Sequence, residues 1–416
     1  MNIIETAQVT GFWGTHEVHF TAHDDFNFII GPNGSGKSTL LQLIAGVLQA
    51  DKTTLSKLDF DRVKITLRNP KTRKKPTIEA ERVKESPYFQ VQYSIFESAS
   101  EKPYKYELSD LEYLEPFGSW KIRLKITGKS IKTLRQHLEE LVSLTWLSVQ
   151  RSGHPQEASH FDPLDQKLED LSNRLVRYLS SIGKQVNRLH EKFQEQVFLS
   201  MFTTNRSELR KIPSQREIEK EKHALIQIFS QFQIDKKNYS EKIEEHFSAL
   251  EGIQEKIKSK QQLSEKEFQA ILDLNRIEKS VEFWEKITEE KGSLLSPRDK
   301  FLELLNNLMQ RKSLSINERN EITIKTQSGK SLTLRQLSSG EKQILIILGE
   351  ALLQEGQSYM YIADEPELSL HVSWQESLAQ NLKALNPSAQ IIFATHSPDI
   401  VGPYLEKIID MEACIK

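Results

Sequence analysis

The chain has 416 residues, with 56 Lys and Arg against 58 Asp and Glu, a formal net charge of -2. This near balance removes the simplest argument for a dedicated DNA-binding domain, because such domains usually carry a basic excess. Cys414 is the only cysteine, so no disulfide forms within the chain and a reducing compartment fits. We expect no signal peptide, because the first residues lack a basic start followed by an apolar core, and no apolar run approaches the ~20 residues that span a bilayer. We therefore expect a cytoplasmic protein with no membrane partner.

The first elements in chain order predict a nucleotide site. Residues 3–10 and 26–31 are typical of strands, and the second leads into the loop GPNGSGKS and a helix over 39–48. This strand, glycine loop and helix is the context in which G-x-x-x-x-G-K-[ST] binds phosphates. Lys37 is expected to reach the β and γ phosphates of ATP, and the Ser38 hydroxyl to bind Mg²⁺. The complete expected ATP-binding set is Gly31, Asn33, Gly34, Ser35, Gly36, Lys37, Ser38 and Thr39.

Alternating segments follow the first helix. RVKITLR, YFQVQYSIF and SWKIRLKIT indicate an antiparallel β lobe over about 55–128, inside a first half that ends at residue 150. A helix over 131–142 and a buried strand over 144–149 complete that half. The basic run at 71–75, KTRKK, fits an exposed turn, and contact with the phosphate backbone of DNA is left open.

Residues 151–318 are expected to form a helical, coiled-coil-like insertion. Asp162 and Pro163 provide an N-cap and a first-turn proline. Apolar residues then recur at spacings of three and four, which is typical of a long amphipathic helix. The stripe fits plain packing or a surface for a partner, and its members are Leu164, Leu168, Leu171, Leu175, Leu179, Ile182, Val186, Leu189, Phe193 and Val197.

The second half, 319–416, contains three further polar groups. A hairpin over 321–334 leads to LSSGEKQ and a helix over 343–353, so Ser338 and Gly340 are expected to bind phosphate at a helix N-terminus. The apolar strand in YMYIADEPE delivers Asp364, a Mg²⁺ ligand, and Glu365, which would orient or activate the attacking water. The strand in IIFATHSPD ends at His396, a candidate contact of the γ phosphate.

In this order of motifs the chain resembles the ABC-type ATPases, α/β P-loop heads in which an LSGGQ signature meets the nucleotide of the opposite subunit. Ser338 matches the signature serine and Gly340 its second glycine, whereas Ser339 and Glu341 replace a glycine and a glutamine. These departures, with DEPELSLH after the acidic strand, resemble the OLD, RecF and SMC-like branch. The resemblance implies head-to-tail dimers that enclose two ATP molecules, with a larger assembly such as a hexamer left open.

The same resemblance implies a glutamine that senses Mg²⁺ and the γ phosphate, for which Gln150 is the best candidate. It also places GFWG near the nucleotide, where Trp13 either stacks on adenine or is a core or rim aromatic.

Within the branch, the chain looks most like the ATPase subunit of PARIS, an anti-phage defence system. There an oligomeric ATPase holds a separate Toprim-type nuclease and releases it when a phage protein is sensed. The ATPase of Septu, whose partner is an HNH nuclease, is a close alternative. A second hypothesis is a RecF-like DNA-binding ATPase of DNA repair. A transporter ATPase fits DEPELSLH and the helical insertion less well.

Overall fold

The computed structural model consists of two compact units, Met1–Val176 with Pro297–Lys416 and Arg177–Ser296. The expected insertion at 151–318 is wider than the second unit. The first turns of its leading helix pack with the ATPase unit, as the ion pair between Lys342 and Asp165 at 2.6 Å shows. The structure describes residues 2–98, 102–109, 133–148, 162–202, 215–259, 261–262 and 264–416.

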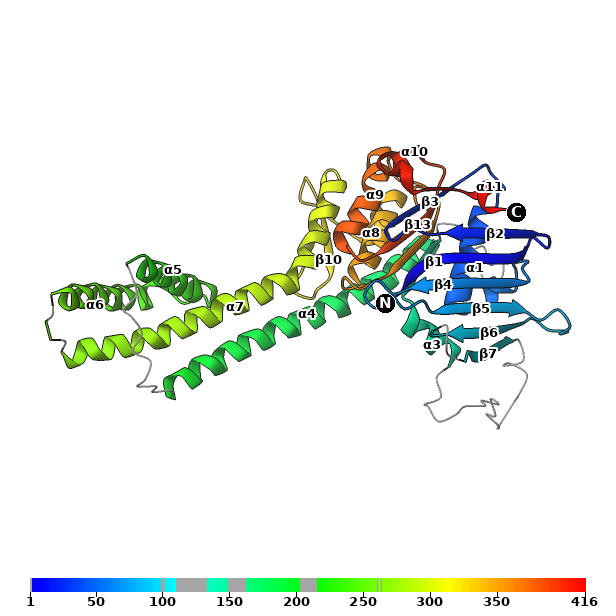
Figure 1. The fold of residues 1–416 in the computed structure, drawn as a ribbon. Helices are drawn as coiled ribbons and strands as arrows, with labels where there is room; N and C mark the ends of the chain where they lie inside the picture. The colour runs from blue at the N-terminus through cyan, green and yellow to red at the C-terminus, as the bar shows by residue number, and fades with distance from the viewer. Residues whose placement is uncertain are drawn as a thin grey trace, which may run out of the picture. The chain divides into compact units, whose positions relative to one another are not determined.

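A parallel five-stranded sheet forms the centre of the first unit (Figure 1), in the order β14-β3-β13-β12-β8. Its strands β3, β12 and β13 are almost continuously apolar and buried, as is usual where both faces of a parallel sheet are covered. Their carboxyl ends meet at one edge, where the motifs lie. The strands are β3 (Phe26–Ile30), β8 (Leu144–Ser148), β12 (Met360–Asp364), β13 (Gln390–Ala394) and β14 (Ile408–Asp410).

An antiparallel six-stranded sheet, in the order β2-β1-β4-β5-β6-β7, forms a second layer. The expected β lobe is confirmed for β4 to β7, and the N-terminal strands belong to the same sheet because β1 pairs with both β2 and β4. The segment SWKIRLKIT lies outside the described residues. The strands are β1 (Ile3–Phe12), β2 (His16–Thr21), β4 (Arg62–Arg68), β5 (Thr77–Arg82), β6 (Gln90–Phe96) and β7 (Tyr104–Ser109).

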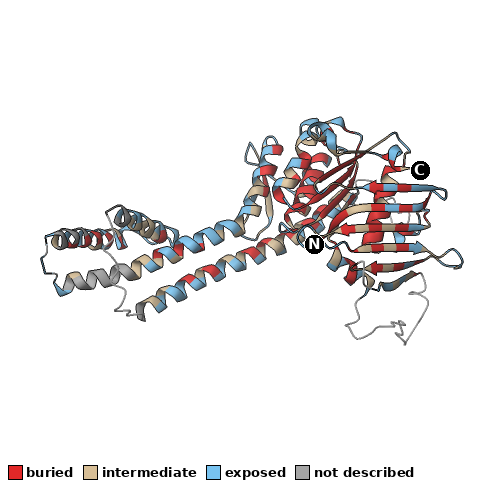
Figure 2. Ribbon diagram, in the orientation of Figure 1, coloured by how far each residue is buried: buried red, intermediate tan, exposed pale blue. Residues whose placement is uncertain are grey.

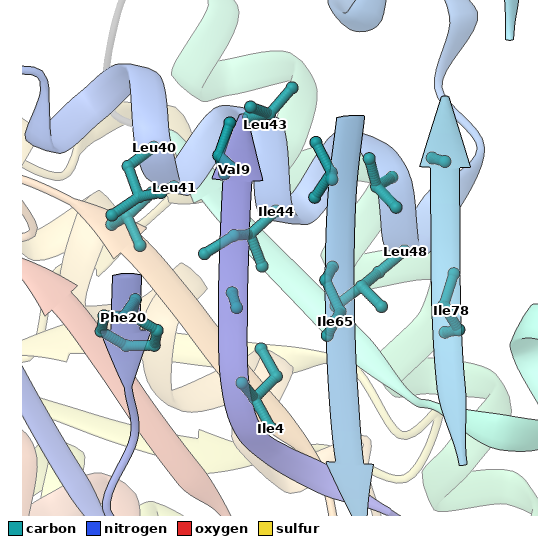
Figure 3. Close-up of a cluster of buried hydrophobic side chains, with 14 of the residues drawn as sticks. Ile4, Val9, Phe20, Leu40, Leu41, Leu43, Ile44, Leu48, Ile65 and Ile78 are labelled. Atoms are coloured by element: carbon teal, nitrogen blue, oxygen red, sulfur yellow. The ribbon is translucent and has the colours of Figure 1, made fainter. Parts of the chain in front are cut away.

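Helix α1 (Lys37–Gln49) joins the two sheets into one core. Its apolar residues are buried all round, and the cluster they form includes Val9 and Ile65 of the antiparallel sheet and Ile362 of the parallel one. Figure 3 shows the α1 side chains facing those of the antiparallel strands. A helix that is apolar on all sides is stable only when it is enclosed. This enclosure fixes the position of the glycine loop that precedes it.

The second half adds a small three-stranded sheet and the helices that flank the parallel sheet. Helix α8 begins at Ser339 rather than at the expected residue 343, because Ser338 caps it. Short helices α2 (Lys52–Leu55) and α3 (Leu134–Leu141) belong to the first half. The other elements are β9 (Lys312–Ile316), β10 (Ile322–Thr326), β11 (Ser331–Leu332), η3 (Leu334–Gln336), α8 (Ser339–Leu352), α9 (Val372–Leu385), α10 (Pro398–Val401), η4 (Gly402–Lys407) and α11 (Met411–Cys414).

The unit Arg177–Ser296 is helical, as predicted, and its buried residues recur along its helices (Figure 2). Phe193, a member of the predicted stripe, belongs to one apolar cluster with Trp284, so this part of the stripe serves as a packing face. Phe247 and Leu250 belong to a second cluster. Among the described residues no helix is long and apolar enough to cross a membrane. The helices are α4 (Pro163–Phe202), α5 (Gln215–Gln231), η2 (Lys236–Asn238), α6 (Ser240–Lys258) and α7 (Glu265–Leu308); α4 and α7 each extend into the first unit.

Candidate nucleotide site

The glycine loop between β3 and α1 has the backbone that a phosphate cradle requires. Gly34 and Gly36 have φ of 84° and 91°, a left-handed conformation that side chains disfavour. The Lys37 ammonium donates hydrogen bonds to the carbonyl oxygens of Gly31 at 2.8 Å and Pro32 at 3.0 Å. Burial lowers the pKa of Lys37, and the nearby carboxylates of Glu365 and Asp364 act in the opposite direction. The lysine therefore lies folded over the loop.

The aromatic residues at the end of β1 pack on this loop. A Cβ atom at Gly36 would lie 2.9 Å from ring carbons of both Phe12 and Trp13. The Trp13 side chain nevertheless remains 43% exposed, with its ring centroid 4.7 Å from that of Phe12. Trp13 thus lies at the rim of the glycine loop with part of its surface free, which fits a rim aromatic or stacking on adenine but not a core aromatic.

The acidic motif of Asp364 and Glu365 meets the loop at the carboxyl end of β12. The Ser38 hydroxyl donates a hydrogen bond of 2.8 Å to Oδ1 of Asp364, across 326 residues of sequence. Asp364 is only 2% exposed. Burial raises the pKa of its carboxyl group, the Ser38 hydrogen bond opposes that rise, and the charges of Glu365 and Glu367 add to it. The two expected Mg²⁺ ligands are therefore adjacent, in a site that favours an incoming positive charge.

Glu365 follows directly in a turn of unusual backbone conformation. Its φ is 49°, which is uncommon for a residue other than glycine and is often found at functional sites. The turn is held because the Glu365 amide donates a hydrogen bond of 2.8 Å to the carbonyl oxygen of Ala394. The side chain is half-buried beside the Ser38 and Asp364 pair. This is a position from which a carboxylate can orient a water molecule.

His396 lies in the turn after β13, and its side chain is exposed. The turn is bound to the acidic motif through Glu367, whose Oε1 accepts from the Thr395 hydroxyl at 2.7 Å and from the His396 amide at 2.9 Å. Sequence reasoning did not single out Glu367. Its only signal there was its position two residues after Glu365, in a stretch read as a family marker.

The signature segment forms the N-terminus of α8. Ser338 is the N-cap, and its amide and hydroxyl donate to Oε2 of Glu341 at 2.8 and 2.9 Å, which completes a capping box. The Lys312 ammonium lies 2.6 Å from the other oxygen of Glu341. Burial raises the pKa of Glu341, but the hydrogen bonds from Lys312 and Ser338 outweigh it and lower the pKa overall. The Glu341 carboxylate is thus bound by side chain and main chain of the same chain, whereas Ser338 and Ser339 are exposed.

The signature also touches residues 364–370, the acidic turn at the carboxyl end of β12. A Cβ atom at Gly340 would lie 2.4 Å from the carbonyl oxygen of Ser369, so only glycine fits without a shift of the backbone. The Gln343 side-chain amide donates a hydrogen bond of 2.8 Å to the Pro366 carbonyl oxygen. The structure therefore brings the glycine loop, the acidic strand and the His396 turn together, with the signature packed behind the acidic turn. Gln150 lies outside the described residues.

The residues present fit a nucleotide and its Mg²⁺. The Ser35 hydroxyl is shielded from solvent yet has no hydrogen-bond partner among the described residues. An orphaned hydroxyl in a glycine loop suits a phosphate oxygen. No group of three or more His, Cys, Asp or Glu suited to a metal occurs in the described part of the chain. Ser38 and Asp364 would therefore hold Mg²⁺ together with phosphate and water oxygens, the usual arrangement for this ion.

A family model described as an AAA ATPase domain matches residues 4–401. The chain belongs to this ATPase family. A relative described as the Retron Vc95 probable ATPase, from Vibrio cholerae serotype O1 biovar El Tor, is 33% identical over 82 residues. That match covers 17% of this chain and 16% of the relative, so the two share one segment.

Solved structures of Smc head domains also match. One, from Pyrococcus furiosus and bound to the C-terminal domain of ScpA, has a TM-score of 0.45 at 15% identity, covering 97% of this chain and 92% of its own. Another, from Pyrococcus yayanosii, has a TM-score of 0.44 at 17% identity, covering 97% and 93%. The assignment as an α/β P-loop ATPase head with a helical insertion follows from the family match and the topology described above.

Proposed function

We propose that this ATPase hydrolyses ATP at composite sites between two copies of the chain arranged head to tail. The observation that carries the proposal is the hydrogen bond between Ser38 and Asp364, which joins the phosphate loop to the acidic strand in one subunit. The exposed Ser338 and Ser339 at the N-terminus of α8 supply a second phosphate-binding end for the nucleotide of the other subunit.

Each residue has a definite task in this proposal. Lys37 exchanges its two carbonyl partners for phosphate oxygens, so its buried ammonium group keeps the hydrogen-bond acceptors that it needs. Glu365 orients and activates the attacking water, and His396 contacts the γ phosphate. When bound, Mg²⁺ neutralises the charge that develops on the phosphate oxygens.

We further propose that the chain is the regulatory ATPase of a bacterial anti-phage defence system and holds a separate effector nuclease. The DEPELSLH stretch and the match to the Retron Vc95 probable ATPase support this role. PARIS, with a Toprim-type nuclease released on sensing a phage protein, is the preferred system, and Septu, with an HNH nuclease, is the alternative.

The test has two parts. ATP hydrolysis should fall at least 100-fold in Glu365→Gln with ATP still bound, and Lys37→Ala should lose ATP binding; unchanged turnover in both variants would exclude this site. In a pull-down from the native host, tagged Glu365→Gln protein with ATP should then capture a nuclease in stoichiometric amount. This complex should persist after treatment with added DNase. The fold of that nuclease would distinguish PARIS from Septu.

One observation favours the RecF-like alternative. The turn between β4 and β5 exposes Lys71, Arg73 and Lys74, which have no carboxylate partner among the described residues, while Lys75 pairs with Glu5 at 2.7 Å. This reading predicts ATP-dependent DNA binding that weakens steeply with salt and is lost when the basic residues of this turn are neutralised. Capture of DNA alone in the pull-down would support it.

A further inference from the structure

Two turns lie side by side at the carboxyl edge of the parallel sheet. The acidic turn, 364–370, follows β12, and the histidine turn, 395–397, follows β13. Thr395 is 1% exposed, so its hydroxyl requires an acceptor inside the protein. Glu367 supplies that acceptor at 2.7 Å and, with the same oxygen, accepts from the His396 amide at 2.9 Å.

A second connection runs between the same turns. The Ser397 hydroxyl donates to the Gln375 side-chain oxygen at 2.6 Å, and the Gln375 side-chain NH₂ group donates to the Leu370 carbonyl oxygen at 3.0 Å. The Glu365 amide adds a main-chain bond to Ala394 at 2.8 Å. The catalytic carboxylate and His396 are thus anchored to one hydrogen-bonded unit rather than to two independent loops.

We propose that Glu367 is a positioning residue, whose side-chain oxygen presets the histidine turn so that His396 meets the γ phosphate of ATP. The proposal rests on the proposed function, because it assigns His396 to the nucleotide. All of the hydrogen bonds that the structure gives the carboxylate pass through Oε1. Its Oε2 is shielded from solvent and accepts no hydrogen bond within the described residues. The position therefore requires an acceptor oxygen on a side chain long enough to reach Thr395 and His396, and it does not require a negative charge.

Two conservative variants separate these properties. Glu367→Gln keeps the length and an acceptor oxygen but removes the charge, whereas Glu367→Asp keeps the charge and withdraws the acceptor by one methylene. Glu367→Asp should lower kcat by about 10- to 100-fold with the KM for ATP within about threefold, since small displacements of a catalytic group are costly and the phosphate loop is untouched. Glu367→Gln should recover most of that loss. Glu376→Ala, at an exposed acid on α9, is the matched control and should leave both constants unchanged.

A double-mutant cycle tests whether the effect passes through His396. In a His396→Ala background, Glu367→Asp should lower kcat by less than about twofold, because the group that it positions is already gone. Full, additive losses would overturn the proposal. So would a Glu367→Gln enzyme that is as slow as Glu367→Asp, since the charge would then be the property that matters.

A readout that needs no hydrolysis separates this proposal from the proposed function. Amide hydrogen exchange of peptides covering 390–401 should accelerate about tenfold in Glu367→Asp and stay near the wild-type rate in Glu367→Gln. Equal exchange in the wild type and Glu367→Asp would show that Glu367 does not hold the turn. Wild-type protein that lacks ATPase activity but shows the expected exchange pattern would refute the proposed function and leave the positioning role standing.

Discussion

Replacing Glu341 tests whether the signature is organised within its own subunit. Glu341→Ala removes the capping box with Ser338, which costs about 1 kcal/mol. It also leaves the Lys312 ammonium, whose side chain is only 21% exposed, without its carboxylate, and a hydrogen bond to a charged group contributes about 2 kcal/mol. The N-terminus of α8 should therefore be destabilised by about 3 kcal/mol. Glu341→Gln keeps an acceptor for the Ser338 amide and should cost about 2 kcal/mol.

Hydrogen exchange of α8 peptides is the suitable assay, because a chain with two compact units need not unfold in one step. A loss of 3 kcal/mol corresponds to roughly 100-fold faster exchange. Because the pKa of Glu341 is lowered in the folded state, its stabilisation is present above its ordinary value of 4.5 and is lost as the pH falls through the folded value. The difference in thermal stability between the wild type and Glu341→Ala should therefore shrink as the pH falls below about 4.5. Acceleration below about fivefold in Glu341→Ala would refute the reasoning.

Three further substitutions have defined outcomes. Gly340→Ala places a Cβ atom 2.4 Å from the Ser369 oxygen and should cost about 2 kcal/mol in chemical denaturation, with slower ATP turnover; unchanged stability would show that the acidic turn yields freely. Ser338→Arg should abolish ATP-dependent dimers in sedimentation while one-subunit ATP binding persists, and intact ATPase activity would rule out the head-to-tail site. Tyr93→Phe removes a buried hydroxyl that donates to the Val47 carbonyl oxygen at 3.2 Å, and should lower the free energy of unfolding by about 1 kcal/mol; a gain in stability would contradict that reading.

Much of this molecule was predictable because its signals are local. The strand, the glycine loop and helix α1, predicted over 39–48 and observed over Lys37–Gln49, are encoded within a few residues of each other. The N-cap at Asp162, whose Oδ1 accepts from the Leu164 amide at 3.0 Å, is local in the same way. Apolar spacing likewise predicted the helices of the second unit. The differences concern an element end and a whole strand. Helix α8 starts four residues early because the reciprocal hydrogen bonds of Ser338 and Glu341 extend the helix to its cap, and strand β9 (Lys312–Ile316) lies within the range expected to be helical.

The sequence by itself therefore determined the chemical groups of the candidate site, since strand, loop and cap preferences act over a few residues. Only the tertiary structure decided which groups meet. Ser38 and Asp364 become neighbours because β3, β13 and β12 lie in register in one parallel sheet, which brings their carboxyl ends to the same edge. The inward-facing Glu341 and the bridge from Glu367 to the histidine turn follow from the same packing. The capping box gives Glu341 one partner that is local in sequence, but its pairing with Lys312 and the contact of Glu367 with the histidine turn join residues 28 or more positions apart, which no local pattern specifies.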